Sequence, residues 1–446
     1  MNKRLAVTLF LVVLMVSVSA CAGAIDYQKR WLDLPPGYSY ADAKVINDNG
    51  QVAGSVWMNK PVFWDVDGVP MVIPFPNGVS QMLIAGMNNK GQIALSASGS
   101  HYTAHVWTKG KGFIALSFPP GGEWAYVKGI NDLGQVIGWY GGLSLPSGLS
   151  CVWDADTGAV LSISADASFE DINDLGQICG TSYGDDSFPA IWNPNGLLTP
   201  LSPLPGMPYG RGQRINRIGQ VAGYSVGSEG YILTLWDVDG SAIQIGSASP
   251  WCEVEDLNDA GQAIVNRDDG GFGCYLWNAE DGLTAWQHHN ANSINNLGQI
   301  AGNNGQPHPY VCTPDNLNPL CADARPSVTE LWPPDGRMVR VSILGVIDRD
   351  GDEVTLTIDS ITQDEPLVGK GTANTAPDAT GIGTDTAMLR AERMGNGNGR
   401  VYRVLFTAQD SRGAKSKGLV KVYVPHDQRE GATCVDDGLF YDSTEE

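Results

Sequence analysis

The stretch Ile46-Asn47-Asp48-Asn49-Gly50-Gln51 decides the fold, because the same phrase returns six more times along the chain. Each copy has an apolar residue, asparagine, two variable residues, glycine and glutamine, in this order. The seven copies are Ile46–Gln51, Met87–Gln92, Ile130–Gln135, Ile172–Gln177, Ile215–Gln220, Leu257–Gln262 and Ile294–Gln299. Successive asparagines are 37 to 43 residues apart, which indicates repeated structural units.

Each copy has the composition of a β-hairpin turn. Asparagine bonds readily to its own backbone at the start of a turn, and glycine accepts a positive φ. The glutamine then opens an apolar run, such as Gln135-Val136-Ile137-Gly138-Trp139. We therefore expect strands on both sides of every copy.

A second landmark follows each turn, in which an apolar residue and tryptophan precede another turn. It occurs at Phe63-Trp64, Val106-Trp107, Val152-Trp153, Ile191-Trp192, Leu235-Trp236 and Leu276-Trp277, and as Val311-Cys312 in the seventh unit. Because these tryptophans are periodic, we expect them in the core. An atypical last unit is usual in repeat proteins.

The units predict an all-β fold, with a seven-bladed β-propeller over residues 25–321. Each unit holds about four short strands, which is the content of a propeller blade. The chain lacks a sustained helical period, which argues against helical solenoids, and an open β-solenoid is the alternative. Closure of the ring predicts that Trp31-Leu32-Asp33-Leu34 adds the outer strand of the last blade, with Asn316–Leu320 as the competing segment.

The Ile-Asn-x-x-Gly-Gln turns that alternate with apolar-Trp strands resemble the HAF family of extracellular repeats. The resemblance covers residues 30 to 315. It implies a repeated extracellular fold, and it brings no catalytic residues to this chain.

A different strand pattern begins near Ala324-Arg325-Pro326. Four alternating runs start at Met338, Val354, Val401 and Leu419 and predict a small β-sandwich over residues 326–426. This pattern is similar to bacterial immunoglobulin-like or cadherin-like modules. Residues 427–446 are expected to form a mobile acidic tail.

Residues 1–20 have the features of an export signal of the lipoprotein type. Lys3 and Arg4 precede the apolar segment Leu5–Val16, and Val18-Ser19-Ala20-Cys21 resembles a bacterial lipobox. We expect Cys21 to be lipidated, so that the mature protein is an outer-membrane or cell-surface lipoprotein. Cleavage after Ala22 or Ala24 is the alternative, which would give a secreted protein.

Composition narrows the partners. The net charge of −21 and a pI near 4.5 disfavour a nucleic-acid partner, because phosphate backbones are repelled. The same acidic composition gives no basic patch that would bind anionic lipids. A lipid anchor at Cys21 is therefore the expected contact with a membrane. We expect an extracellular ligand, either carbohydrate or protein.

Export permits disulfides, and Cys312 with Cys321 is the expected pair because a turn-rich segment separates them. Cys252 with Cys274 and Cys151 with Cys179 are further candidates, and buried free thiols are the alternative for each pair. Cysteine spacing alone does not fix the connectivity.

Asp348-Arg349-Asp350-Gly351-Asp352 is the candidate metal site. Alternating carboxylates around a glycine turn suit calcium, although this chain lacks the glutamate that completes an EF-hand loop. Asp378 or Asp385 are further candidate ligands, and an acidic turn between strands is the alternative. Calcium is the one cofactor that the sequence suggests.

We name no catalytic residue in this sequence. The expected function is that of a non-enzymatic bacterial surface protein for binding or adhesion. One alternative is a secreted hydrolase or lyase that acts on polysaccharide at the propeller mouth. The other alternative is a structural envelope protein.

Overall fold

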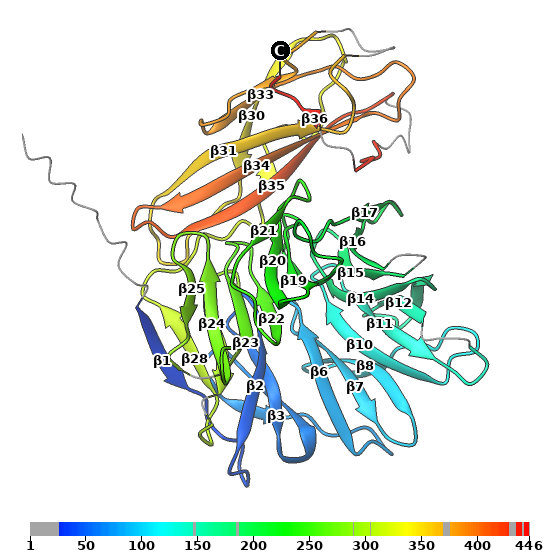
Figure 1. The fold of residues 1–446 in the computed structure, drawn as a ribbon, viewed down its shortest axis with the longest axis vertical. Helices are drawn as coiled ribbons and strands as arrows, with labels where there is room; N and C mark the ends of the chain where they lie inside the picture. The colour runs from blue at the N-terminus through cyan, green and yellow to red at the C-terminus, as the bar shows by residue number, and fades with distance from the viewer. Residues whose placement is uncertain are drawn as a thin grey trace, which may run out of the picture.

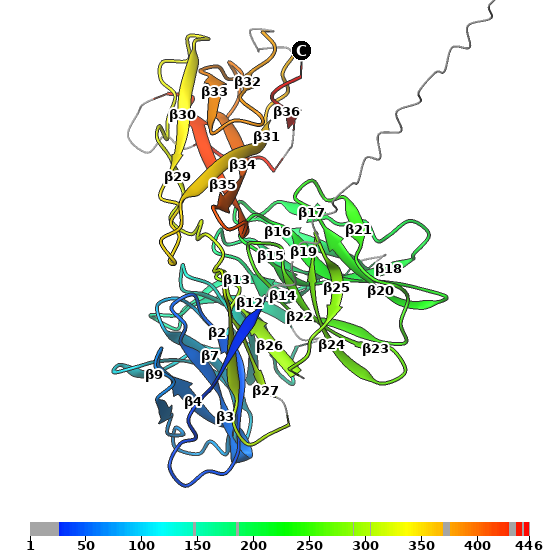
Figure 2. The same cartoon turned by 90° about the vertical axis from the view of Figure 1, so that its left-hand side faces the viewer.

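The structure is a computed structural model that describes residues 26–145, 149–183, 187–288, 290–303, 305–368, 375–427, 434–438 and 441–445. Within these residues the chain is all-β, and its one helical turn is the 3₁₀ turn η1 (Trp57–Asn59). Seven four-stranded sheets surround a channel, and two further sheets form a second domain on one face of the ring (Figure 1, Figure 2). The expected seven-bladed propeller is confirmed.

Six blades follow the chain order from the innermost to the outermost strand. Blade one comprises β2 (Ala41–Ile46), β3 (Val52–Val56), β4 (Lys60–Trp64) and β5 (Pro70–Val72). Blade two comprises β6 (Gln81–Met87), β7 (Gln92–Ser98), β8 (Tyr102–Thr108) and β9 (Gly112–Ala115). Blade three comprises β10 (Trp124–Ile130), β11 (Gln135–Gly141), β12 (Leu149–Asp154) and β13 (Val160–Ser164). Blade four comprises β14 (Ala167–Ile172), β15 (Ile178–Ser182), β16 (Phe188–Trp192) and β17 (Leu198–Pro200). Blade five comprises β18 (Tyr209–Ile215), β19 (Val221–Gly227), β20 (Gly230–Trp236) and β21 (Ala242–Gln244). Blade six comprises β22 (Cys252–Leu257), β23 (Ala263–Asp268), β24 (Phe272–Asn278) and β25 (Gly282–Ala285).

Blade seven joins the two ends of the repeat region. It contains β26 (Asn290–Ile294), β27 (Ile300–Asn303) and β28 (Tyr310–Pro314), and its outermost strand is β1 (Tyr27–Trp31). The N-terminal segment therefore closes the ring, as predicted, but its strand begins earlier than expected and ends at Trp31. Leu32 continues the pairing through its N–H, which donates to the carbonyl of Pro309 at 2.9 Å.

The tryptophan landmarks lie in the core, as predicted. Trp64, Trp153 and Trp236 are fully buried. The indole N–H of each donates to a backbone carbonyl of the segment that leads into its own or the next blade, such as Trp153 to Ser117 at 2.9 Å. Cys312 takes the same place in blade seven, where it is also fully buried.

The repeated asparagines form a closed ring of hydrogen bonds. The side-chain N–H of each donates to the backbone carbonyl of the asparagine in the next blade, and the last donates back to Asn47. The donors are Asn47, Asn88, Asn131, Asn173, Asn216, Asn258 and Asn295, at 2.8–3.1 Å. All seven side chains are 3–5% exposed. Since buried amides are costly when unpaired, this ring holds neighbouring blades in register.

Each asparagine also stabilises its own turn. In blade four, the Asn173 side-chain oxygen accepts the N–H groups of Leu175 and Gln177, and its N–H₂ also donates to the Gln177 side chain at 2.9 Å. The turn glycine, Gly176, has a φ of 76°, which glycine adopts without strain. The glycine and glutamine of the phrase thus serve the turn that the asparagine anchors.

We expect Asn173→Ala to lower the free energy of unfolding by about 2–4 kcal/mol, because it leaves the carbonyl of Asn216 and the side chain of Gln177 without their buried partner. The matched control is Asn278→Ala in the outer turn of blade six, where the side-chain oxygen accepts only the local N–H groups of Glu280 and Asp281. Asn278→Ala should lower the free energy of unfolding by less than about 1 kcal/mol. Urea unfolding of the two variants measures the difference, and equal losses would contradict an inter-blade role.

The second domain is a sandwich of two four-stranded sheets. One sheet contains β29 (Arg325–Pro326), β30 (Met338–Leu344), β33 (Thr386–Arg390) and β32 (Ala379–Thr380), and the other contains β35 (Lys415–Val424), β34 (Arg400–Asp410), β31 (Val354–Gln363) and β36 (Tyr441–Asp442). Val341, Leu389, Phe406 and Val422 are among the buried residues that form its core. The predicted β-sandwich is confirmed.

The described part of the C-terminal tail is docked, which corrects the expectation of a mobile tail. Strand β36 pairs with β31, and Ser443 is fully buried. Asp436 forms ion pairs with Arg403 and Lys421, at 2.9 Å for Lys421. The tail carboxylate therefore contributes to neutralising two cations of the sandwich sheet.

The sandwich docks on the face of the propeller that carries the seven asparagine turns, which we call the turn face. Arg349 donates to the carbonyl of Asp48 at 2.5 Å, and Arg217 donates to the carbonyl of Cys321 at 2.8 Å. Asn318, in the segment between the domains, donates to the side chain of Gln262 at 2.9 Å. Polar contacts to three blades thus fix the sandwich on this face.

The expected disulfide between Cys312 and Cys321 is wrong. Both residues are buried free cysteines, and they lie in different cores. Cys312 packs between blades six and seven with Trp286, whereas Cys321 belongs to the core of the sandwich. The other candidate pairs are also separated, because Cys252 and Cys274 pack into different blade interfaces, as do Cys151 and Cys179.

Candidate functional site

Exposed aromatic side chains mark the face of the propeller opposite the turn face. Among the described residues, the exposed aromatic side chains lie where the innermost strands begin, where the second and third strands of a blade are joined, or at or after the end of an outermost strand. We call this the aromatic face, and its residues are Trp31, Tyr40, Trp57, Tyr102, Phe118, Tyr183, Tyr209, Trp251 and Phe272. A one-sided concentration of exposed aromatic surface is typical of a binding site.

The turn that carries Trp57 is strained. Met58 and Asn59 have φ values of 62° and 53°, a region that side-chain-bearing residues seldom occupy. Trp57 is 77% exposed and Met58 is 59% exposed. Strained backbone that presents apolar side chains to solvent is commonly found at functional sites.

A β-bulge in every innermost strand directs side chains into the channel. The pairing register shifts three residues before each ring asparagine, as between Ala43 and Val45 or between Phe169 and Asp171. The bulged residues are Lys44, Ala85, Lys128, Glu170, Gln213, Glu255 and Asn292. Bulges re-aim side chains next to active and binding sites, and here five residue types occupy the same position of the seven blades, lining either the channel or the pocket beside it.

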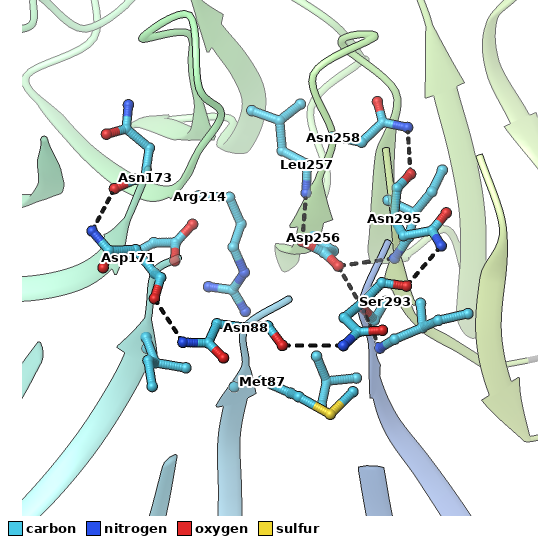
Figure 3. Close-up of a pocket in the computed structure, with 18 of the residues that line it drawn as sticks. Met87, Asn88, Asp171, Asn173, Arg214, Asp256, Leu257, Asn258, Ser293 and Asn295 are labelled. Atoms are coloured by element: carbon cyan, nitrogen blue, oxygen red, sulfur yellow. Dashed lines mark hydrogen bonds between the residues drawn. The ribbon is translucent and has the colours of Figure 1, made fainter. Parts of the chain in front are cut away.

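The channel has a volume of about 360 Å³ and is charged on one side. Figure 3 shows Arg214 reaching into it between Asp171 and Asp256. The Arg214 guanidinium donates to the carbonyl of Glu255 at 2.6 Å, and Asp256 accepts from Ser293 at 2.6 Å. Asp171 accepts the N–H of Ile215 in the next blade at 3.0 Å. These residues therefore join blades as well as line the channel.

A polar pocket of about 290 Å³ opens beside the channel at the aromatic face. We call it the mouth pocket. Its lining includes Lys128, Glu170 and Arg211 from three successive blades, with Tyr224, Tyr231 and Trp251 beside them. Lys128 and Arg214 line both the mouth pocket and the channel, so the two spaces share part of their walls.

A charge triad forms the floor of the mouth pocket. The carboxylate of Glu170 is 7% exposed and accepts from Lys128 at 3.1 Å, from Arg211, and from Ser168 at 3.0 Å. Burial by itself would raise the pKa of Glu170, but the attraction of Lys128 and Arg211 outweighs it and lowers that pKa. The carboxylate is therefore charged and held in one orientation.

A second ring of side chains follows the asparagine ring at the turn face. The residue after each ring asparagine is Asp48, Asn89, Asp132, Asp174, Arg217, Asp259 or Asn296. Six of them place a side-chain oxygen on the backbone N–H of the preceding blade, at 2.6–2.9 Å. Arg217 has no acceptor atom and contacts the sandwich instead.

Burial raises the pKa of Asp259 to about 7, and the nearby charges of Asp48 and Asp174 add to this rise, while the Arg217 N–H opposes it. Burial and the charge of Asp132 raise the pKa of Asp174 to about 6. A carboxyl with a raised folded-state pKa stabilises the fold below its unfolded pKa, and this stabilisation is lost as pH rises through the folded value. The stabilisation that Asp259 and Asp174 contribute to the propeller should therefore fall as the pH rises from about 4 to about 7.

We expect Asp259→Asn to stabilise the protein at about pH 8 by on the order of 1–4 kcal/mol, with little effect at about pH 4. Asn89 and Asn296 already make the same bond in other blades, so asparagine fits this place. Thermal melts across this pH range measure the effect. The control is Asp67→Asn in an exposed turn, and a parallel response of the two variants would contradict the assignment.

The predicted calcium ligands lie together. Carboxylate oxygens of Asp348, Asp350 and Asp352 are all within 4.8 Å of one another. Arg412 lies 3.9 Å and 3.8 Å from Asp350 and Asp352, and Asp350 also accepts the N–H of Leu317 at 2.8 Å. The loop thus has an internal partner for its charge, and calcium stays a prediction that a calorimetric titration with millimolar calcium would test.

The further metal candidates do not join this cluster. Asp378 is fully buried and pairs with Arg400 at 2.7 Å in the sandwich core. The Asp385 carboxylate accepts from the Thr386 hydroxyl at 2.9 Å. The predicted lipidation residue Cys21 lies outside the described residues.

Sequence analysis did not find the mouth pocket, because its residues come from four blades and share no repeated type. Two signals were available. Glutamate and lysine stand at bulge positions that carry alanine or asparagine in other units, and Trp251 lies outside the tryptophan period.

Within the described residues, no helix is long and apolar enough to span a bilayer.

Comparisons with known proteins give likenesses of fold. No protein-family model matches the sequence, and no curated protein matches it. Virginiamycin B lyase from Staphylococcus aureus is 11% identical, with 65% of this chain and 99% of that chain covered and a TM-score of 0.43. YCF48 bound to D1 peptide is 11% identical, with 65% and 97% covered and a TM-score of 0.43. TolB from Acinetobacter baumannii is 13% identical, with 63% and 65% covered and a TM-score of 0.38. Likenesses at this level do not extend to ligand or activity.

Proposed function

We propose that this chain is an exported bacterial surface protein of the HAF repeat type. It binds an extracellular carbohydrate or protein through the aromatic face of its propeller, without catalysis. The observation that carries the proposal is that the exposed aromatic side chains of the described residues all lie on this one face. The turn face is partly covered by the sandwich, which leaves the aromatic face as the accessible end of the channel.

Aromatic residues are suited to this role because they present a large apolar area with few rotatable bonds. Trp251 and Phe272 stack with ring centroids 6.4 Å apart, and Tyr126 stacks on Trp139 at 5.6 Å. Stacked pairs at a rim form flat platforms that suit sugar rings or aromatic side chains of a partner. A purely structural envelope protein would have no need of such platforms.

A polysaccharide-acting enzyme is the second candidate, because Glu170 and Glu253 line one pocket. Glycosidases require a carboxylic acid whose pKa is raised, beside a charged carboxylate. Lys128 and Arg211 instead lower the pKa of Glu170 against the effect of burial. Glu170 therefore fits the charged carboxylate of such a pair and does not fit its acid.

We expect the protein to bind members of a glycan array or an array of extracellular proteins, and Trp57→Ala combined with Tyr209→Ala to weaken that binding at least about tenfold. The matched control is Leu161→Ala, which removes a side chain with 54% exposure from the outer strand β13. Unchanged binding by the aromatic variant would contradict the proposal. Release of reducing ends from a polysaccharide would favour the enzyme.

We also propose that Cys21 carries a lipid that holds the protein at the cell surface. The support is the lipobox-like sequence Val18-Ser19-Ala20-Cys21 at the end of the apolar leader. Radioactive palmitate should label the protein, and Cys21→Ala should abolish the label. Unlabelled mature protein in the medium would contradict the anchor and indicate secretion.

A further inference from the structure

The mouth pocket differs from the rest of the aromatic face in having fixed polar groups beside an aromatic platform. Glu170 is held by two cations that are themselves 31% and 40% exposed, so Lys128 and Arg211 present donors to the pocket. Trp251 is 38% exposed at its rim and is supported from behind by its stacking on Phe272. The platform and the charged groups are therefore both held in place before any ligand arrives.

Arg211 has a donor that the chain itself does not satisfy. Its Nη2 donates to Glu170, but its Nε–H is buried and has no hydrogen-bond partner among the described residues. An unpaired buried donor costs about 1–3 kcal/mol, so such groups are usually paired in native proteins. Arg211 lines the mouth pocket, and its side chain is 40% exposed, so the rest of its guanidinium can donate to an acceptor in this pocket.

Three cations and two carboxylates line the pocket, because Arg214 lines it together with Lys128, Arg211, Glu170 and Glu253. Arg214 lies between Asp171 and Asp256, whose charges offset its own, so that Lys128 and Arg211 are the cations that oppose Glu170 and Glu253. An anionic ligand would have to compete with Glu170 for both cations, and the protein as a whole carries a net charge of −21. A ligand with neutral hydroxyl groups can instead donate to the carboxylate and accept from the guanidinium without a net charge.

The walls of the pocket suit a flat ring. Tyr224 and Tyr231 pack edge to face with centroids 5.1 Å apart, and Trp251 lines the pocket with them. The volume of about 290 Å³ lies near the lower end of the range for small-ligand sites, which is about 300–1000 Å³. The space therefore fits one small unit better than a long chain.

From these features we propose that the mouth pocket binds one uncharged sugar unit of a glycan. The sugar ring packs on Trp251, and adjacent hydroxyl groups bind Arg211 and Glu170. This inference rests on the proposed binding function, and it narrows that function to a neutral saccharide at one defined place.

The test uses a glycan array probed with the full mature protein, in competition with glucose, galactose and mannose on one side and glucuronate and N-acetylneuraminate on the other. We expect a neutral sugar to compete and the acidic sugars to fail. Trp251→Ala and Glu170→Gln should each weaken glycan binding at least about tenfold. Trp251→Phe should recover most of the affinity, because it keeps an aromatic platform.

Two controls separate the pocket from the rest of the surface and from folding. Leu161→Ala removes an exposed side chain from the outer strand β13, away from the pocket, and should change the affinity of the competing sugar less than about threefold. Melting temperatures of all variants identify any that fail to fold, and Trp251→Phe then carries the test. Competition by acidic sugars alone, or glycan binding that the pocket variants leave unchanged, would overturn the sugar site. Binding to a protein array without any glycan would overturn this inference and leave the proposed binding function intact.

Discussion

Seven asparagine amides, each donating to the backbone carbonyl of the next blade, join the first and last repeats into one hydrogen-bonded circuit. Each amide also fixes its own turn, so local structure and blade-to-blade contact rest on the same buried group. Displacing one blade would leave donors and acceptors unpaired in two neighbours, away from water. The strict identity of this residue in all seven units follows from that double use, because aspartate or serine could not supply the N–H₂ donors.

The same circuit determines where variation is tolerated. Residues at the turn face serve the ring and the docking of the sandwich, as Asp48 does through its carbonyl to Arg349. Three residues before each ring asparagine, the bulge removes one residue of the innermost strand from regular pairing. The side chain of that residue is free to differ between blades. Lysine, glutamate and alanine all occur there. A uniform scaffold thereby carries a mouth with different chemistry on each side.

The sequence predicted the blades well because each unit repeats the same turn-forming residues, such as Asn131 and Gly134 in blade three. It also predicted closure by the N-terminal segment, with an error of a few residues in the bounds of the strand. The bulges could not be predicted, because Lys44, Ala85 and Glu170 share no chemical type. The mouth pocket was missed for the same reason, since Glu170 and Arg211 meet only after two blades pack. The disulfide prediction failed because closeness in sequence says little across a domain boundary, where Cys312 and Cys321 enter different cores.

Closure of blade seven by β1 has a consequence for how the molecule would stand on a cell. Strand β1 begins at Tyr27 beside the turn face and ends at Trp31 on the aromatic face. Five residues lie between Cys21 and Tyr27, and the six steps reach roughly 20 Å at most, at about 3.3–3.6 Å per residue. A lipid at Cys21 would therefore keep the rim of blade seven within about this distance of the bilayer. The sandwich on the turn face would then limit how far this face can tilt toward the membrane.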